Sequence, residues 1–171
     1  MINNYPAALK QVLKNEGGWA DHPADPGGAT MKGITIGTYR QWKSNPNITK
    51  EQLRAISDAE VYDIYRQQYW NKIDGDYLPS GVDYAVFDAA VNMGVGRAAK
   101  LIQEAVGVTA DGVLGPKSLS AIQKADPKEL IEKFSALKEA FYRSLKTFPV
   151  FGVGWLRRVA EVKTISGGMI G

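Results

Sequence analysis

The sequence predicts a mainly α-helical fold, interrupted by a small loop or short β segment around residues 17–38. Two observations support this class. Apolar residues recur at spacings of three and four along most of the chain, which is the period of one helix face. The 171 residues are 44% hydrophobic and 23% charged, as in ordinary globular proteins, so one core can form without covalent cross-links.

The first predicted helix ends at a glutamate. Apolar residues from Leu9 to Leu13 share one face, and Glu16 continues that face by one turn. Two glycines follow Glu16 and end the helix. Glycine and proline are then concentrated in residues 17–38, which predicts a shaped loop with a brief extended segment at 31–35.

Two capping boxes predict the next helix starts. They pair Thr49 with Gln52 and Ser57 with Glu60, so that a side-chain acceptor precedes each helical stretch. The second box begins a helix whose apolar face runs to Trp70. Clusters of aspartate, glycine and proline then predict turns before the next apolar stretch.

The second half of the chain carries three further helical stripes. Stretches 82–93 and 98–105 each have one apolar face, so we expect each to be buried on one side. Asp126, followed by proline, predicts the start of the longest helix, which Pro149 should end. A short helix is expected at 155–162.

Glycines 167, 168 and 171 predict a loosely held tail. No repeat or linker separates the halves of the chain. We therefore expect a catalytic half, 1–80, and a binding half, 81–171, packed as one compact unit.

Charge and hydropathy exclude several partners. The net charge is +3, and the basic clusters 32–43, 133–146 and 157–163 have the spacing of solvated helix faces, so nucleic acid is not an expected partner. No stretch reaches the ~18 apolar residues of a membrane span. The first 18 residues lack the pattern of a secretory signal. We expect a monomer.

The inventory of reactive side chains favours carboxylates as catalysts. The chain has no cysteine, which excludes disulfides, thiolate metal sites and a cysteine nucleophile. It has a single histidine, His22, which excludes a multi-histidine zinc site and leaves a serine hydrolase dependent on that imidazole. No cofactor or metal is expected.

Glu16 and Asp25 form the sharpest candidate pair. A glutamate on an apolar helix face loses hydration, and this favours the protonated form that a general acid needs. Asp25 lies in a glycine loop that can fold back across the helix end, where its carboxylate could hold a water. Two carboxylates in unlike environments are the general arrangement for cleaving glycosidic bonds, and Thr30 or Thr35 could position the water.

The same residues also have a structural interpretation. Glu16 before two glycines can be an ordinary helix end, and Asp25 before proline and glycine is a common turn. His22 can be a solvent-facing loop residue as well as a substrate contact. The spacing by itself leaves both interpretations open.

Aromatic and polar residues supply further candidate substrate contacts. Trp19 adjoins the Glu16 segment, and Tyr69 and Trp70 offer flat apolar faces to sugar rings, although most aromatic residues in such a protein lie in its core. Asp88 and Asn92, spaced i and i+4, could bind acetamido groups or tie their helix to a neighbouring loop.

One long motif resembles a known family. The run from Glu16-Gly17-Gly18-Trp19 through Asp25-x-Gly27-Gly28-x-Thr30 to Gly33-Ile34-Thr35 closely resembles the opening motif of glycoside hydrolase family 108. That family contains muramidases of phage endolysins and bacterial secretion activator proteins. The segments Phe87-Asp88-x-Ala90-Val91-Asn92 and Asp111-Gly112-Val113-Leu114-Gly115-Pro116 resemble the family's predicted peptidoglycan-binding region.

The resemblance implies a lysozyme-like α fold that hydrolyses the β-1,4 bond between N-acetylmuramic acid and N-acetylglucosamine in bacterial peptidoglycan. It implies that Glu16 is the acid, whereas Asp25 and a threonine are inferred from the similar Glu, Asp and Thr order of phage-type lysozymes, which invert the anomeric configuration. In those enzymes the threonine lies one position further along, so Thr30 and Thr35 both stay open.

Two other functions remain open at this stage. A lytic transglycosylase can act with one catalytic glutamate, and a non-catalytic module could bind the wall through residues 81–123. The resemblance also implies an antimicrobial, bacteriolytic activity on the cell wall, in the periplasm. The protein would be made in the cytoplasm and reach the wall after holin release or through a dedicated secretion route.

Overall fold

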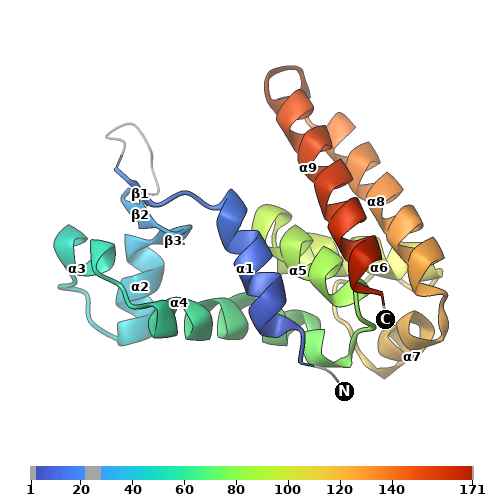
Figure 1. Ribbon diagram of the computed structural model, residues 1–171, viewed down its shortest axis with the longest axis horizontal. Helices are drawn as coiled ribbons and strands as arrows, with labels where there is room; N and C mark the ends of the chain where they lie inside the picture. The colour runs from blue at the N-terminus through green and yellow to red at the C-terminus, as the bar shows by residue number, and fades with distance from the viewer. Residues whose placement is uncertain (1–2, 22–27, 171) are drawn as a thin grey trace. The chain divides into compact units, whose positions relative to one another are not determined.

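The computed structural model describes residues 3–21 and 28–170 (Figure 1). Most of these residues are helical, and the described sheet has three short strands in the order β1-β2-β3, which confirms the mainly α class. The chain divides into two units. The N-terminal unit is Pro6–Gln68, and the C-terminal unit is Tyr69–Gly171 together with the first residues of the chain.

The N-terminal unit combines four helices of the described chain with the small sheet. Its elements are α1 (Tyr5–Asn15), β1 (Trp19–Ala20), β2 (Thr30–Met31), β3 (Ile34–Thr35), α2 (Ile36–Lys43), α3 (Lys50–Arg54) and α4 (Asp58–Tyr65). The predicted first helix is confirmed, and Glu16 is the first residue after it.

A tight turn joins β2 to β3. The strands are antiparallel, with Thr30 opposite Thr35 and Met31 opposite Ile34. The two turn residues, Lys32 and Gly33, both have positive φ angles, 51° and 80°. Two such residues form the turn type whose twist matches a β-hairpin. The predicted extended segment is therefore one arm and the turn of a real hairpin.

Helix α2 begins inside the predicted loop. The Thr35 side chain accepts a hydrogen bond from the Thr38 amide and caps the helix, a start that the glycine-based prediction of a loop through residue 38 missed. The Thr49 capping box is complete, with both of its hydrogen bonds formed, and it starts α3 as predicted. Ser57 caps α4 through the Glu60 amide.

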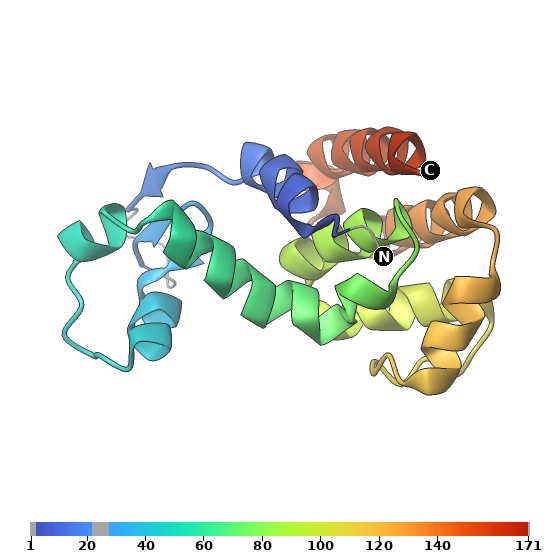
Figure 2. The ribbon, with the colours of Figure 1, turned by 60° about the horizontal axis from the view of Figure 1, so that its bottom comes forward.

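In its described residues, the regular elements of the C-terminal unit are all helices or helical turns. The chain enters it through a π-helical turn (Arg66–Trp70) and two 3-10 turns (Asn71–Ile73 and Gly75–Tyr77). Five helices follow: α5 (Val82–Met93), α6 (Val95–Val106), α7 (Pro116–Lys124), α8 (Pro127–Arg143) and α9 (Phe148–Met169). Figures 1 and 2 show α8 and α9 running side by side.

Helix α5 is the buried centre of this unit. Every residue from 82 to 90 is buried, so the prediction that this helix has only one buried side is wrong. It combines three small alanines with the large rings of Tyr84 and Phe87, which lets neighbouring elements pack against more than one side. Its first turn is fixed by Asp83, which accepts hydrogen bonds from the Gly81 and Tyr84 amides and from the Asn4 side chain.

Helix α9 is much longer than the short helix predicted at 155–162. It spans 22 residues, and Pro149 lies in its first turn instead of ending α8. The glycines at 167 and 168 are helical, so the predicted loose tail is wrong for 167–169. Ser166 is fully buried, which shows that packing against the unit outweighs the low helix propensity of these glycines.

The predicted functional division at residue 80 does not coincide with the boundary of the structural units at Gln68. The division into a catalytic and a binding half stays a prediction. In the described part of the chain, no helix has both the length and the apolar character needed to cross a bilayer.

Candidate functional site

Glu16 lies directly after the last residue of α1, where the helix geometry still holds its backbone. Its amide donates to the Val12 carbonyl at 3.3 Å, so the α-helical hydrogen-bond pattern continues through this residue. The side chain is half-buried. Glu16 is therefore neither a fully solvated surface carboxylate nor a core residue, and this matches the environment expected for a carboxylate that meets a substrate.

The carboxyl group of Glu16 lies against the β2–β3 turn. A Cβ atom placed on Gly33 would lie 2.8 Å from Glu16 Oε2 and 2.5 Å from the hydroxyl oxygen of Tyr65. These distances are shorter than any van der Waals contact, so only glycine fits at the turn. Gly33 also has the positive φ angle of 80° that glycine adopts readily.

Tyr65 connects this turn to α4. Its hydroxyl donates to the Lys32 carbonyl at 2.7 Å, and its side chain is 2% exposed. The Lys32 ammonium forms an ion pair with Asp58 at the start of the same helix, at 2.7 Å, and this hydrogen bond lowers the pKa of the Asp58 carboxyl. Two contacts from α4 thus fix the turn that faces Glu16.

The two candidate threonines face each other across the hairpin, but their hydroxyls are used differently. Thr35 Oγ1 donates to Thr38 Oγ1 at 3.0 Å and accepts from the Thr38 amide at 3.1 Å, as the cap of α2. Within the described residues, Thr30 has no hydrogen-bond partner for its hydroxyl, and it is half-buried. The geometry leaves Thr30 available to a water or ligand and occupies Thr35 with structure.

Trp19 is half-buried on β1, where it pairs with Met31. The guanidinium of Arg54 lies over its ring, 5.5 Å from the centroid. Such a cation stabilises one face of the indole. Trp19 lies in the N-terminal unit, together with Glu16, Thr30 and Thr35.

The predicted residues Asp25 and His22 lie outside the described residues. Their assigned roles stay predictions.

The other predicted contact residues lie in the C-terminal unit. Tyr69 is half-buried in the π-helical turn. Trp70 is 1% exposed, packs against Tyr5 and Phe87 at centroid distances of 5.2 and 5.3 Å, and donates its Nε1 proton to Asp76 at 2.9 Å. A ring enclosed in this way has no face for a sugar, so the assignment of Trp70 to substrate binding is corrected to a core role.

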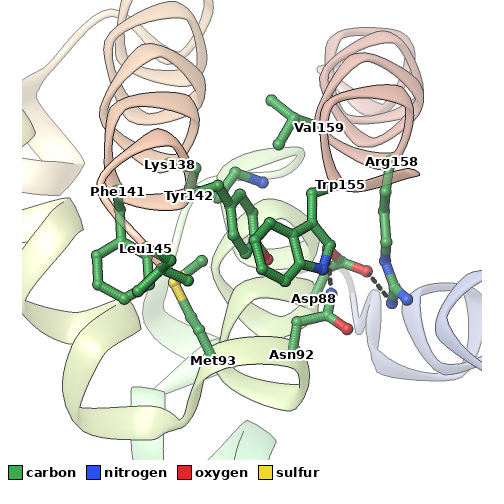
Figure 3. Close-up of a pocket in the computed structure, with 10 residues that line it drawn as sticks. All are labelled: Asp88, Asn92, Met93, Lys138, Phe141, Tyr142, Leu145, Trp155, Arg158 and Val159. Atoms are coloured by element: carbon green, nitrogen blue, oxygen red, sulfur yellow. Dashed lines mark hydrogen bonds and ion pairs between the residues drawn. The ribbon is translucent and has the colours of Figure 1, made fainter. Parts of the chain in front are cut away.

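Asp88 and Asn92 lie on the C-terminal half of α5 and contribute to a pocket of about 340 Å³ (Figure 3). Asp88 is 2% exposed, pairs with Arg158 of α9 at 2.8 Å, and accepts from Asn92 Nδ2 at 3.1 Å. The Asp88 carboxylate therefore ties α5 to α9, so its role is structural, and its partner is a helix instead of the predicted loop. Asn92 is exposed at the rim.

Sequence reasoning missed several residues with a role in these sites. Gly33 belongs to the motif that resembles the family but has no role assigned from sequence. Tyr65 belongs to the predicted apolar helix face that runs to Trp70, and this pattern gives its hydroxyl no role. Lys138 was assigned to a solvated basic face but is 2% exposed in the same pocket as Asp88, so that assignment is wrong. Its position four residues after the buried Phe134 was the signal for burial.

In the part of the chain that the structure describes, no three histidine, cysteine, aspartate or glutamate side chains gather in a way that could hold a metal ion. The chemistry that the described N-terminal unit supports is carried by one half-buried carboxyl group facing a rigid glycine turn. A group of this kind can donate a proton to a leaving oxygen.

A mainly helical chain with a small three-stranded sheet, and with a glutamate just after the first helix, has a lysozyme-like, mainly α fold. The sequence model of the glycosyl hydrolase 108 family matches residues 9–94, half of the chain. The chain therefore belongs to the glycosyl hydrolase 108 family. A second family, described as a predicted peptidoglycan domain, matches residues 97–160.

A solved structure supports this assignment over nearly the whole chain. The structure of SagA from Brucella abortus is similar with a TM-score of 0.86 and 40% sequence identity, covering 97% of this chain and 95% of that chain. No curated protein sequence matches the chain. The resemblance found in the motifs is confirmed. The chain is a glycoside hydrolase by family, with a domain that supports peptidoglycan as its substrate.

Proposed function

We propose that the protein is a lysozyme that hydrolyses the β-1,4 bond between N-acetylmuramic acid and N-acetylglucosamine in peptidoglycan. Family membership supports a glycoside hydrolase, and the peptidoglycan domain supports the polymer. The observation that carries the proposal is the position of Glu16, half-buried after α1 with its carboxyl group against Gly33 and Tyr65.

In the proposed mechanism Glu16 is the general acid. It donates its proton to the glycosidic oxygen as the bond to the anomeric carbon breaks, so the leaving sugar departs as a neutral alcohol. Asp25 acts as the base that takes a proton from the attacking water, and the Thr30 hydroxyl positions that water. The free hydroxyl of Thr30 favours it over Thr35, which caps α2.

This mechanism predicts inversion at the anomeric carbon, because water attacks the face opposite the leaving group. A retaining enzyme would instead use the second carboxylate as nucleophile. Proton NMR of the first product formed from a chitooligosaccharide or a purified glycan strand separates the two, since the α and β anomers have distinct resonances. An initial β product would contradict the assignment of Asp25 as base.

The central experiment replaces Glu16 by glutamine, which keeps the shape of the side chain and removes the acid. We expect turnover of purified sacculi to fall by about 10³-fold or more, with little change in unfolding. Glu51→Gln, on the exposed face of α3 in the same unit, is the matched control and should leave turnover unchanged. Equal lysis by wild type and Glu16→Gln would overturn the proposal and leave a wall-binding module.

The products distinguish hydrolysis from transglycosylation. A hydrolase adds water and leaves reducing N-acetylmuramic acid ends, whereas a lytic transglycosylase closes the sugar on itself and leaves 1,6-anhydro ends. Mass spectrometry of digested sacculi measures this directly, because the two ends differ by the mass of one water. If 1,6-anhydro ends were the main product, the protein would be a lytic transglycosylase and not a hydrolase.

We further propose that the protein acts on the wall in the periplasm as a bacteriolytic, endolysin-type enzyme, or as its bacterial counterpart delivered by a dedicated secretion route. Co-expression with and without a holin tests the first route. Lysis that depends on the holin and on Glu16 supports it, and lysis without any holin favours the second route.

A further inference from the structure

The pocket of the C-terminal unit combines a charged floor with aromatic walls. Figure 3 shows side chains from α5, α8 and α9 converging on it, with the Asp88–Arg158 pair on one side of the Trp155 ring and Tyr142 on the other. Its volume of about 340 Å³ lies within the range of small-ligand sites. None of the residues considered below has a place in the mechanism proposed above.

The charges in this pocket do not balance. Asp88 and Arg158 neutralise each other at 2.8 Å. Lys138 is the third charged residue that lines the pocket and is 2% exposed. Among the described residues its ammonium has no hydrogen bond or ion pair, and it lies over the ring of Phe134, 5.2 Å from the centroid. One buried positive charge is thus left without an anion.

The missing anion affects the pKa of Lys138. Burial lowers the pKa of its ammonium to about 8, although the Asp88 carboxylate acts in the opposite direction. At neutral pH the group therefore remains charged. Arg158 adds a second unsatisfied donor, since its Nε is buried without a hydrogen-bond partner in the described structure. Buried donors of this kind are satisfied in most proteins, which points to a ligand.

The side chains that form the walls of the pocket indicate which chemical groups a bound ligand carries beside its anionic group. The rings of Tyr142 and Trp155 stack at a centroid distance of 5.0 Å and an angle of 25°, and Leu145 and Met93 also line the pocket. These groups favour short aliphatic substituents over a second charge. A single net positive charge fits a carboxylate better than a doubly charged phosphate.

We propose that this pocket binds the free carboxylate of an alanyl peptide, with its methyl group against the Tyr142 and Trp155 rings and its oxygens facing Lys138. The source of that ligand rests on the proposed function, because peptides ending in alanine are carried by the glycan strands of peptidoglycan. The C-terminal unit would then recognise the peptide stem of the polymer whose glycan the N-terminal unit cleaves.

The test uses the full chain and a pair of small probes, N-acetyl-D-alanyl-D-alanine and its C-terminal amide. NMR titration follows the indole proton of Trp155, which reports on the pocket. We expect saturable shifts with the carboxylate form and affinity about tenfold or more weaker for the amide, because the amide removes one charge-assisted hydrogen bond. Equal binding of both probes, or no shift at Trp155, would overturn the proposal without any variant.

A variant adds a second, independent measurement. Lys138→Met replaces the buried ammonium by a neutral side chain of similar length and should lower affinity for the carboxylate probe about tenfold, with no change for the amide. Lys128→Met, exposed in the first turn of α8, is the control and should bind like wild type. Unchanged binding by Lys138→Met would also contradict the proposal.

Binding of these peptides does not require cleavage of glycan, so the two proposals can fail separately. A protein that hydrolyses sacculi but ignores both probes keeps its proposed function and loses this site. A protein that binds the carboxylate probe but cleaves no glycan keeps the site and loses the hydrolase.

Discussion

Gly33 leaves room for the carboxyl group of Glu16, because a side chain at this position would begin 2.8 Å from Glu16 Oε2. Two contacts fix the turn that carries Gly33 to α4. The hydroxyl of Tyr65, a residue of α4, donates to the Lys32 carbonyl, and the Lys32 ammonium forms an ion pair with the first residue of α4. The position of the proposed acid therefore depends on a hairpin of only a few residues. This relationship allows the environment of Glu16 to be changed without touching Glu16.

Gly33→Ala should impair both folding and activity. The new methyl group collides with Glu16 and Tyr65, and the residue must keep a φ of 80°. We expect a loss of about 2 kcal/mol in the free energy of unfolding and about a tenfold loss of kcat on glycan strands. Urea unfolding and turnover assays measure the two effects.

Gly37→Ala is the control for this change. Gly37 is an exposed helical residue of α2, and its added Cβ would lie at an ordinary contact distance of 3.9 Å from Thr35 Oγ1. This variant should gain up to about 1 kcal/mol from the higher helix propensity of alanine and retain full activity. Activity in Gly33→Ala equal to that of Gly37→Ala would show that Glu16 does not depend on the turn.

Tyr65→Phe should separate positioning from packing. The ring stays in the core, and only the hydroxyl that donates to the Lys32 carbonyl is lost. We expect a loss of about 1 kcal/mol in stability and a lower kcat with nearly unchanged KM, because the turn loosens without removing a substrate contact. Rescue of kcat at reduced temperature would agree with a positioning role, and a change confined to KM would contradict it.

The local signals in the sequence predicted where helices begin and end better than they predicted how the helices pack. The motif around Glu16 located the end of α1, and the cap at Asp126 located the start of α8, because a cap is a contact between residues close in the chain. Thr30 and Thr35 were both candidates because their spacing cannot show that one hydroxyl caps a helix that was itself missed.

The errors come from contacts between residues far apart in the chain. Trp70 was a candidate sugar contact until its packing against Tyr5 and Phe87 placed it in the core. Helix α9 extends through glycines that disfavour helices, because its inner face is buried in the C-terminal unit. Lys138 is charged like its neighbours in sequence, and only the meeting of α5, α8 and α9 shows that it is buried.

Lys138 should give the protein an unusual alkaline stability profile. Burial lowers its pKa from 10.5 to about 8 in the native state, so below pH 8 the native protein carries a buried ammonium at a cost of about 3 kcal/mol. Between pH 8 and about 10 the native state releases this proton while the unfolded chain keeps it, so the free energy of unfolding should rise with pH.

Other groups around Lys138 limit this window. Burial raises the pKa of Tyr84 and of Tyr142. Above pH 10 these tyrosines ionise in the unfolded chain before they do in the native protein, so stability should then fall. Urea unfolding at pH 7 to 10 should show the rise for wild type and Lys128→Met, and a flat profile for Lys138→Met.

Thr30 and Thr35 face each other across the hairpin, and their hydroxyls should act differently. Valine has nearly the shape of threonine, suits a strand and lacks the hydroxyl. Thr30→Val should lower kcat about tenfold or more with little change in unfolding, because its hydroxyl has no partner among the described residues and can bind water. Thr35→Val should lose about 1 kcal/mol of stability, because α2 loses its cap, and should keep kcat near that of wild type.

The pair of variants is informative because both threonines lie in the same hairpin and both changes remove one oxygen. A general disturbance of the hairpin would affect both variants alike, whereas the proposed roles separate activity from stability. If Thr35→Val loses turnover while Thr30→Val keeps it, the hydroxyl that orients the water is the one that caps α2. The attacking water would then lie beside the first turn of α2, next to Thr38, instead of beside the strand that contains Thr30.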